Sequence, residues 1–158
     1  MDTPAVGALE DVWPLQAELN RKVGIDTQGL GAELAAAEQA GRLDDAGDLR
    51  VQVGRALKNY LDALSAECHE MLECLAWKHW YAEAREGRQH ELRDLQNARV
   101  EAVDMLFFWV SICQLLGLSP DDVCRLYAKK LAINHRRRDE GRPQADHGSH
   151  EQENRSVV

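Results

Sequence analysis

The sequence has no surplus of positive charge: 19 lysines and arginines stand against 27 aspartates and glutamates, a formal net charge of −8. A surface of this sign repels the phosphate backbone of nucleic acids. Duplex nucleic acid is therefore not expected as a partner. A small phosphorylated ligand stays possible, because divalent cations held by carboxylates reverse the local sign of the field.

The four cysteines include no CxxC pair. Three of them fall within apolar helical patterns, where a thiol behaves as a small hydrophobic group, so reduced and buried thiols are expected. The longest apolar run, residues 105–116, is shorter than the roughly 20 residues that span a bilayer. Residues 1–13 contain acidic side chains and no continuous apolar segment, so they do not resemble a secretory signal. We expect a cytoplasmic protein with no membrane partner.

Strand signals are weak along the whole chain, whereas apolar residues recur every three or four positions among Ala, Leu, Glu and Arg. With 158 residues, 44% of them hydrophobic and 29% charged, the chain is sufficient for one packed domain. We expect an all-α bundle of about five helices around a central apolar helix, completed by dimerisation. The domain is expected to cover residues 1–141, and residues 142–158 are expected to form a disordered tail.

Helix boundaries are indicated by capping residues. Pro14 is expected in the first turn of the first helix, and Asp48 as the N-cap of a long one. Gly117 is expected just past the end of the central helix, and Ser119 and Pro120 at the start of the last. The expected helices cover residues 12–23, part of 27–47, 48–75, 90–116 and 120–138.

Two acidic pairs have the spacing i, i+3: Glu67 with Glu70, and Glu101 with Asp104. Residues three apart lie on one face of a helix, so each pair offers two carboxylates to one point. If the two helices pack side by side, the four carboxylates converge, and oxygen ligands of this kind suit Mg²⁺. The alternative is a solvated acidic face, which is common on charged helices.

The segment ECHEMLECLAWKHW, residues 67–80, resembles a signature of the dimeric dUTPases, which belong to the MazG-like all-α nucleoside triphosphate pyrophosphatases. In that family an ExxE motif precedes a WKxW-type aromatic cluster by ten residues. Residues 101–104 (EAVD) are similar to the family's ExxD motif, and residues 15–20 (LQAELN) to its LQxxLN element. The resemblance spans residues 15–141 and leaves 27–47 and the tail unmatched.

The last of the four matching elements agrees least well with the family's motif. Residues 130–137 (KLAINHRR) are similar to the family's KNxxNxxR element. However, Leu131 stands where Asn is frequent, Arg138 replaces a Gln and Arg142 replaces a Tyr. These departures leave the chemistry intact and the base specificity open.

The resemblance implies Mg²⁺-dependent hydrolysis of a deoxynucleoside triphosphate, dUTP above all, to the monophosphate and pyrophosphate. Glu70, Glu101 and Asp104 are implied as metal ligands, and Glu67 as a ligand that also deprotonates the attacking water.

The resemblance also implies groups that bind the substrate. Lys130, Asn134 and Arg137, at i, i+4 and i+7 on one helix face, are implied to bind phosphates. Their alternative role is a basic helix end that favours the helix dipole. The base is expected to meet the amides of Gln16 and Asn20 and to stack on Trp77 or Trp80. The alternative is that Gln16 and Asn20 are ordinary surface residues and that the two tryptophans belong to the core.

Two other functions remain open. One is a pyrophosphatase for dCTP or a purine deoxynucleotide. The other is a non-enzymatic interaction protein that dimerises through residues 105–116 and binds an acidic partner through residues 136–138. His147 and His150 form an HxxH spacing in the expected tail, which could bind a metal ion if it were helical. No apolar residues there would hold a helix, so even adventitious metal binding is not expected.

Overall fold

The structure is a computed structural model that describes residues 6–139, 151, 155 and 157, without the side chains of residues 43–46. No strand occurs among these residues, only one isolated antiparallel bridge between Leu75 and Leu92. The expected all-α class is confirmed. The described residues form six helices: α1 (Leu9–Lys22), α2 (Thr27–Gln39), α3 (Leu43–Glu73), α4 (Ala82–Arg85), α5 (Leu95–Leu115) and α6 (Pro120–Asp139).

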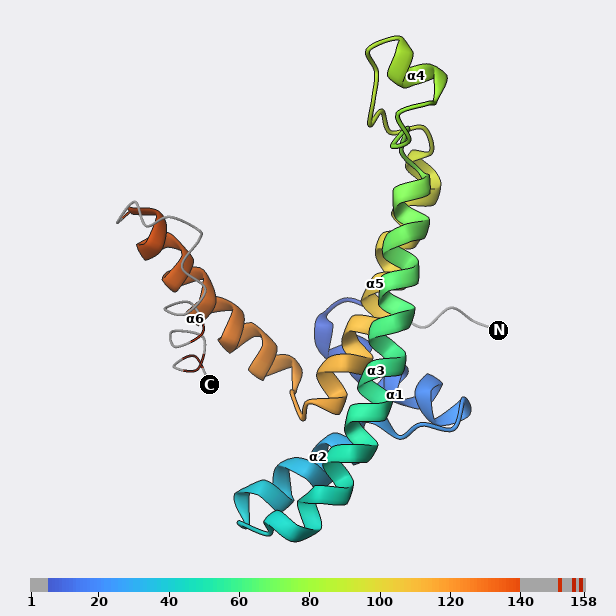
Figure 1. Cartoon of the computed structure of the whole chain (residues 1–158). Helices are drawn as coiled ribbons and strands as arrows, with labels where there is room; N and C mark the ends of the chain where they lie inside the picture. Colours follow the sequence, from blue (N-terminus) through green and yellow to red (C-terminus); the bar gives the residue numbers. More distant parts are fainter. Residues whose placement is uncertain (1–5, 140–150, 152–154, 156, 158) are drawn as a thin grey trace. The chain divides into compact units, whose positions relative to one another are not determined.

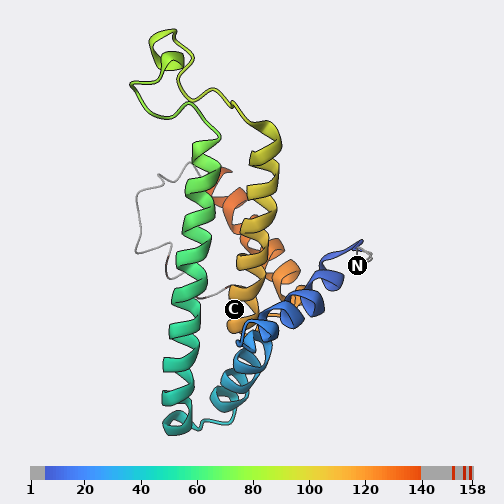
Figure 2. The same cartoon turned by 90° about the vertical axis from the view of Figure 1, so that its right-hand side faces the viewer.

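The chain divides after Gly117 into two compact units. In the first unit α3 and α5 lie side by side along most of their length (Figures 1 and 2). Helix α2 packs against both of them, and α1 packs against α5 and α2. Helix α5 therefore touches all three other long helices of this unit, which agrees with the expected central apolar helix.

The hydrophobic core of the first unit lies where α2, α3 and α5 meet. Val53, Ala56 and Tyr60 of α3 are buried against Leu115 of α5, and the Tyr60 ring packs on Phe108. The three α3 residues recur with the helical period and so lie on one face of α3, and their burial against α5 holds the two helices together. Full burial of a side chain such as Leu115 contributes about 1.5–3 kcal/mol.

Two glycines let α2 approach the end of α5 closely. A Cβ added at Gly31 would lie 2.0 Å from the backbone oxygen of Gln114, closer than any carbon can come. Gly117 has a φ of +71°, which favours glycine because other residues are strained there. Gly117 follows the C-cap Leu116, so its expected place just past the helix is confirmed.

Three expected helix starts are wrong. Helix α1 begins at Leu9, so Pro14 lies in its second turn rather than its first. Helix α3 begins at Leu43, and Asp48 lies inside it, because an isolated glycine at position 47 costs only about 1 kcal/mol and does not stop a helix. Helix α5 begins at Leu95 instead of residue 90, because the Asp94 side chain accepts from the backbone N–H of Asn97 and caps it there.

The connection between α3 and α5 is a folded loop. The backbone N–H of Ala76 donates to the oxygen of Glu91 at 2.8 Å, and that of His90 donates to the oxygen of Ala76 at 2.9 Å. Helix α4, a single turn, lies between the segments expected as helices at 48–75 and 90–116, at one end of the α3–α5 pair (Figure 2).

The second unit contains α6, whose start has the expected cap. The backbone N–H of Asp122 donates to Ser119 Oγ at 3.1 Å, and the N–H of Ser119 donates to Asp122 Oδ2 at 3.1 Å. Arg125 and Ser119 hold the pKa of the Asp122 carboxyl well below its usual range. The tail expected at 142–158, apart from 151, 155 and 157, and the histidine pair at 147 and 150 lie outside the described residues.

Helix α5 buries only part of its apolar surface. Val110 and Leu115 are fully enclosed, whereas Val103, Leu106 and Phe107 are exposed. No single helix in the described part of the chain is long and apolar enough to cross a bilayer; α5 and α6 meet that test together, by length and composition alone.

Candidate metal centre and its cavity

Three carboxylates from two helices converge. Glu67 of α3 and Glu101 and Asp104 of α5 place one oxygen each within 4.8 Å of one another. Glu101 is buried, at 6% exposure, and the other two are half-buried. We call these three residues the acidic cluster. The expected side-by-side packing of the two acidic helices is thus observed.

Glu70, the fourth expected ligand, is exposed and does not belong to the acidic cluster. Three residues turn an α-helix by about 300°, so Glu70 is offset from Glu67 by about 60° around α3. Glu67 faces α5, and Glu70 lies to the side of that contact. Its negative charge still acts on Glu67, whose pKa it raises.

The pKa of Glu67 is raised above its ordinary value. Burial is the main cause, followed by the hydrogen bond with the Glu101 side chain and by the negative charges of Glu70, Asp104 and Glu101. Both effects penalise the charged form. The acidic cluster is therefore a concentration of like charge that a cation would relieve.

Asn97 orients the buried member of the cluster. Its Nδ2 donates to Glu101 Oε1 at 2.9 Å and lies 3.4 Å from the sulfur of Cys74. The pair has the spacing i, i+4 on α5, one turn apart on the same face. Sequence reasoning missed Asn97, although this spacing before Glu101 is visible in the sequence.

A cavity of about 410 Å³ opens between α1, α3 and α5 and contains part of the acidic cluster. Glu67 and Asp104 line it on one side, and Gln16 and Asn20 of α1 line it as well. Two of the four expected metal ligands and the expected base-binding amides therefore share one cavity. The remaining lining is mostly apolar or aromatic: Leu19, Val23, Tyr60, Phe107 and Phe108.

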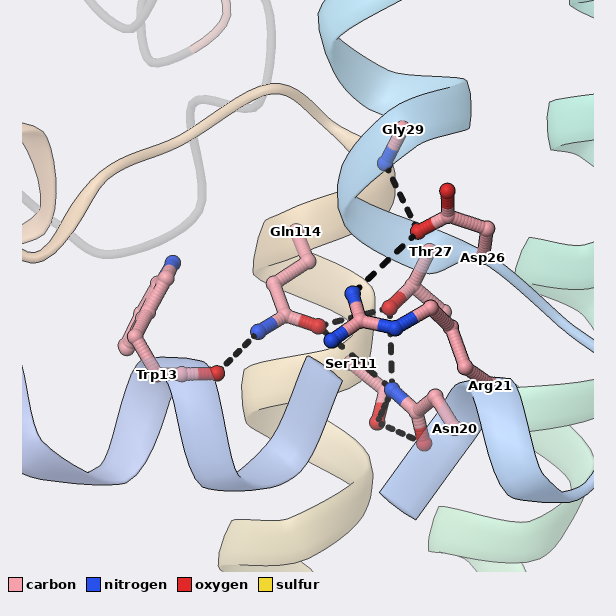
Figure 3. Close-up of polar contacts among 8 residues, drawn as sticks. All are labelled: Trp13, Asn20, Arg21, Asp26, Thr27, Gly29, Ser111 and Gln114. Atoms are coloured by element: carbon pink, nitrogen blue, oxygen red, sulfur yellow. Dashed lines mark hydrogen bonds and ion pairs between the residues drawn. The ribbon is translucent and has the colours of Figure 1, made fainter. Parts of the chain in front are cut away.

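Five buried polar side chains join α1, α2 and α5, and we call them the amide network: Gln16, Asn20, Thr27, Ser111 and Gln114. Figure 3 shows four of them together with the backbone of Trp13. Asn20 Nδ2 donates to Thr27 Oγ1 at 2.9 Å and to Ser111 Oγ at 3.0 Å. Thr27 Oγ1 donates to Gln114 Oε1 at 2.6 Å. Buried polar groups need such partners, and the network supplies them.

Three members of the network were missed from the sequence. Ser111 and Gln114 are polar residues at i, i+3 within an otherwise apolar run, and this interruption is a signal that could have found them. Thr27 gave no such signal, because it lies in the weakly patterned segment 27–47.

The two tryptophans expected to stack on a base do not line the cavity. Trp77 and Trp80 lie in the loop after α3, where Trp77 Nε1 donates to Glu73 at 3.3 Å and Trp80 is 56% exposed. The aromatic rings of the cavity are instead Tyr60, Phe107 and Phe108.

The three expected phosphate-binding residues, Lys130, Asn134 and Arg137, all lie on α6 in the second unit. Their spacing of four and three residues places them along one side of that helix. Their binding of phosphate stays a prediction.

Comparisons of the chain with protein-family models, with curated proteins and with solved structures found no match.

Proposed function

We propose that this protein is a Mg²⁺-dependent nucleoside triphosphate pyrophosphatase with dUTP as its preferred substrate. The observation that carries the proposal is the shared cavity: Glu67 and Asp104 line it together with Gln16 and Asn20. Its volume of about 410 Å³ lies within the range of ligand pockets, roughly 300–1,000 Å³. A ligand with an anionic part and a hydrogen-bonding ring suits such a lining.

The donors of the acidic cluster fit Mg²⁺. All three ligands are carboxylates, and Mg²⁺ prefers a few such oxygens while it keeps waters and substrate phosphates as its other ligands. The raised pKa of Glu67 agrees with this, because burial and the neighbouring carboxylates disfavour its charged form and a cation would favour it. Glu67, Glu101 and Asp104 would hold the ion. Glu70, outside the acidic cluster, would contribute its negative charge from nearby.

The proposed reaction is hydrolysis of the bond between the α- and β-phosphates. A water oxygen bonds to the α-phosphorus, the bond to the bridging oxygen breaks, and the nucleoside monophosphate and pyrophosphate leave. When bound by the acidic cluster, Mg²⁺ would compensate the charge of the phosphate oxygens and would lower the pKa of a water molecule. Glu67 accepts the proton of the attacking water, a role that its raised pKa favours.

The other side of the cavity would receive the base. Gln16 and Asn20 provide amides, and Phe107 and Phe108 provide aromatic surface at the same place. In this proposal the phenylalanines take the stacking role first predicted for Trp77 and Trp80.

The experiment is an assay of pyrophosphate release from dUTP, dCTP, dTTP, dATP and dGTP, with Mg²⁺ and with a chelator. We expect release from dUTP that requires Mg²⁺ and falls at least about a hundredfold in Glu101→Gln and Asp104→Asn. Asp62→Asn is the matched control, since it removes one exposed acidic charge from α3 outside the acidic cluster, where Asp62 pairs with Lys58. The control should keep the wild-type rate.

Each other outcome has a distinct meaning. A preference for dCTP or a purine nucleotide retains the metal centre and replaces dUTP as substrate. Absence of release from every nucleotide overturns the enzymatic proposal and leaves the interaction protein.

We also propose a homodimer. Leu15, Val103, Leu106 and Phe107 expose apolar surface on α1 and α5, and a second, almost wholly apolar cavity of about 310 Å³ lies among them. An apolar area of this kind marks an interaction surface more often than a solvated one. Light scattering at several concentrations tests it, and Leu106→Glu should shift the mass towards the monomer.

A further inference from the structure

We infer that Ser111 and Gln114 fix the side-chain amide of Gln16 so that its oxygen is left to accept a hydrogen bond from the ligand. These two residues would thus make the cavity select a base that has an N–H where it contacts the Gln16 oxygen. This inference rests on the proposed function, since it concerns how the same cavity selects its base.

The first fixed point is the backbone oxygen of Phe107, which can only accept. Ser111 Oγ donates its single hydrogen to it at 2.9 Å. The competing acceptors are Asn20 Oδ1, which is farther from Ser111 Oγ at 3.4 Å, and the hydroxyl of Tyr60, which also interacts with Ser111 and, unlike a carbonyl oxygen, can donate instead. The Ser111 oxygen must therefore accept from the amides around it, and Gln16 Nε2 lies at 3.1 Å and Asn20 Nδ2 at 3.0 Å. Both NH₂ groups are thereby directed towards Ser111.

The second fixed point is the backbone oxygen of Trp13, which accepts from Gln114 Nε2 at 2.8 Å (Figure 3). The Gln114 amide is planar, so its Oε1 faces the opposite side. There it accepts from Thr27 Oγ1 at 2.6 Å and lies 3.4 Å from Asn20 Nδ2. Since the Thr27 hydrogen is used in this bond, its oxygen accepts from Asn20, which again requires the Asn20 NH₂ group on this side.

These two fixed points leave one arrangement for Gln16. The Asn20 hydrogens are directed to Thr27 and Ser111, so Asn20 Oδ1 faces α1 and accepts from Gln16 Nε2 at 2.9 Å. A half-turn of the Gln16 amide would place its oxygen against Asn20 Oδ1, an unfavourable contact between two acceptors. Gln16 Oε1 is then left as a buried acceptor with no partner among the described residues, although Gln16 is only 4% exposed.

A buried acceptor without a partner is costly. Gln16 lines the cavity, so a ligand that enters there and brings an N–H to the buried Oε1 removes that cost. Uracil and thymine carry N–H at ring position 3. Cytosine carries a lone pair at the same position, which would face the Gln16 oxygen. A site built to accept a hydrogen bond discriminates strongly against a ligand that leaves it unpaired.

The test compares Ser111→Ala and Gln114→Met with wild type and with Ser65→Ala, the same type of change at an exposed position of α3. The measured quantity is the ratio of kcat/KM for dUTP to that for dCTP. We expect the ratio to fall at least about tenfold in the two network variants, chiefly through a higher KM for dUTP. Ser65→Ala should keep the wild-type ratio.

A second readout needs no substrate: the exchange of the Gln16 and Asn20 side-chain amide hydrogens with solvent, followed by NMR in the full chain. Slow exchange in wild type and fast exchange in Ser111→Ala support the fixed orientation. If wild type hydrolyses no nucleotide but these hydrogens exchange slowly, the proposed function fails and the orientation stands. Fast exchange in wild type, or an unchanged ratio in both network variants, overturns the inference.

Discussion

Two groups of polar side chains meet at the cavity, the amide network and the acidic cluster. They differ in how far their hydrogen-bonding groups and charges find partners within the group. In the amide network nearly every donor of Gln16, Asn20 and Thr27 has an acceptor within the protein. In the acidic cluster three carboxylates face each other, and Asn97 donates to one of them, Glu101. The amide-network side is preorganised by the fold alone, whereas the acidic side gathers like charges that the proposed cation would compensate.

The largest effect is expected at the preorganised side. Gly31→Ala places a methyl group against the backbone oxygen of Gln114, so α2 must move away from α5 and carry Thr27 with it. We expect a loss of about 1–3 kcal/mol in the free energy of unfolding, measured by urea denaturation.

Gly54→Ala is the control for this change, because Gly54 lies within α3 and a methyl group there meets open space. It should stabilise the protein by roughly 0.5–1 kcal/mol. Equal effects of the two substitutions would show that α2 and α5 are not in close contact.

The next effect concerns the support of the acidic cluster. Asn97→Ala removes the donor to Glu101 Oε1 and leaves the three carboxylates in place. Loss of such a partner typically weakens metal binding about 10- to 100-fold, and we expect a change of at least about tenfold in Mg²⁺ affinity by calorimetry. Gln96→Ala, at the neighbouring exposed position, is the control and should bind Mg²⁺ as wild type does. If both variants bind Mg²⁺ equally weakly, Asn97 has no specific role in the proposed metal centre.

A smaller effect is expected on the stability of the metal-free protein. Because the pKa of Glu67 is raised in the folded state, the fold keeps its proton at a pH where the unfolded chain has lost it. The stability of wild type should therefore fall as the pH rises from the ordinary value of 4.5 through the folded pKa.

Glu67→Gln should abolish that fall, because glutamine does not titrate, and should be the more stable protein at neutral pH. Glu70→Gln, at the exposed neighbour, should retain most of it. Urea midpoints in a chelator, taken across this pH range, measure the difference. A parallel pH dependence in wild type and Glu67→Gln would show that Glu67 carries no such penalty.

The smallest effect is a difference in thiol reactivity between the two sides. Burial raises the pKa of Cys113, next to the amide network, to about 11, whereas Cys68, beside Glu67, is exposed. Only the thiolate reacts, so at about pH 8 alkylation should modify Cys68 and spare Cys113. Mass spectrometry of the alkylated protein reads this directly, and rapid modification of Cys113 would contradict its burial.

The helices and the acidic cluster were largely predictable, because both follow from local spacing. The i, i+3 pairs located Glu67, Glu101 and Asp104, and Ser119 and Pro120 located the start of α6. The position of Glu70 was not predictable, because the rotation of α3 about its axis is decided by packing against α5 rather than by sequence spacing.

The side of the cavity that holds the amide network was only half predictable. The sequence indicated Gln16 and Asn20, but their partners Thr27, 7 residues from Asn20, and Ser111, 91 residues from it, meet Asn20 only through tertiary packing. Trp80 was favoured for its aromatic character, and the loop between α3 and α5 places it outside the cavity. Spacing finds residues on one helix, whereas contacts between helices need the fold.

The most direct measurement is a calorimetric titration of Mg²⁺ into wild type, Glu101→Gln and the control Asp62→Asn. We expect wild type and Asp62→Asn to bind Mg²⁺ with equal affinity and Glu101→Gln to bind it at least about tenfold more weakly. Equal binding by all three proteins, or none by wild type, would contradict the claim that carboxylates of α3 and α5 together hold the ion.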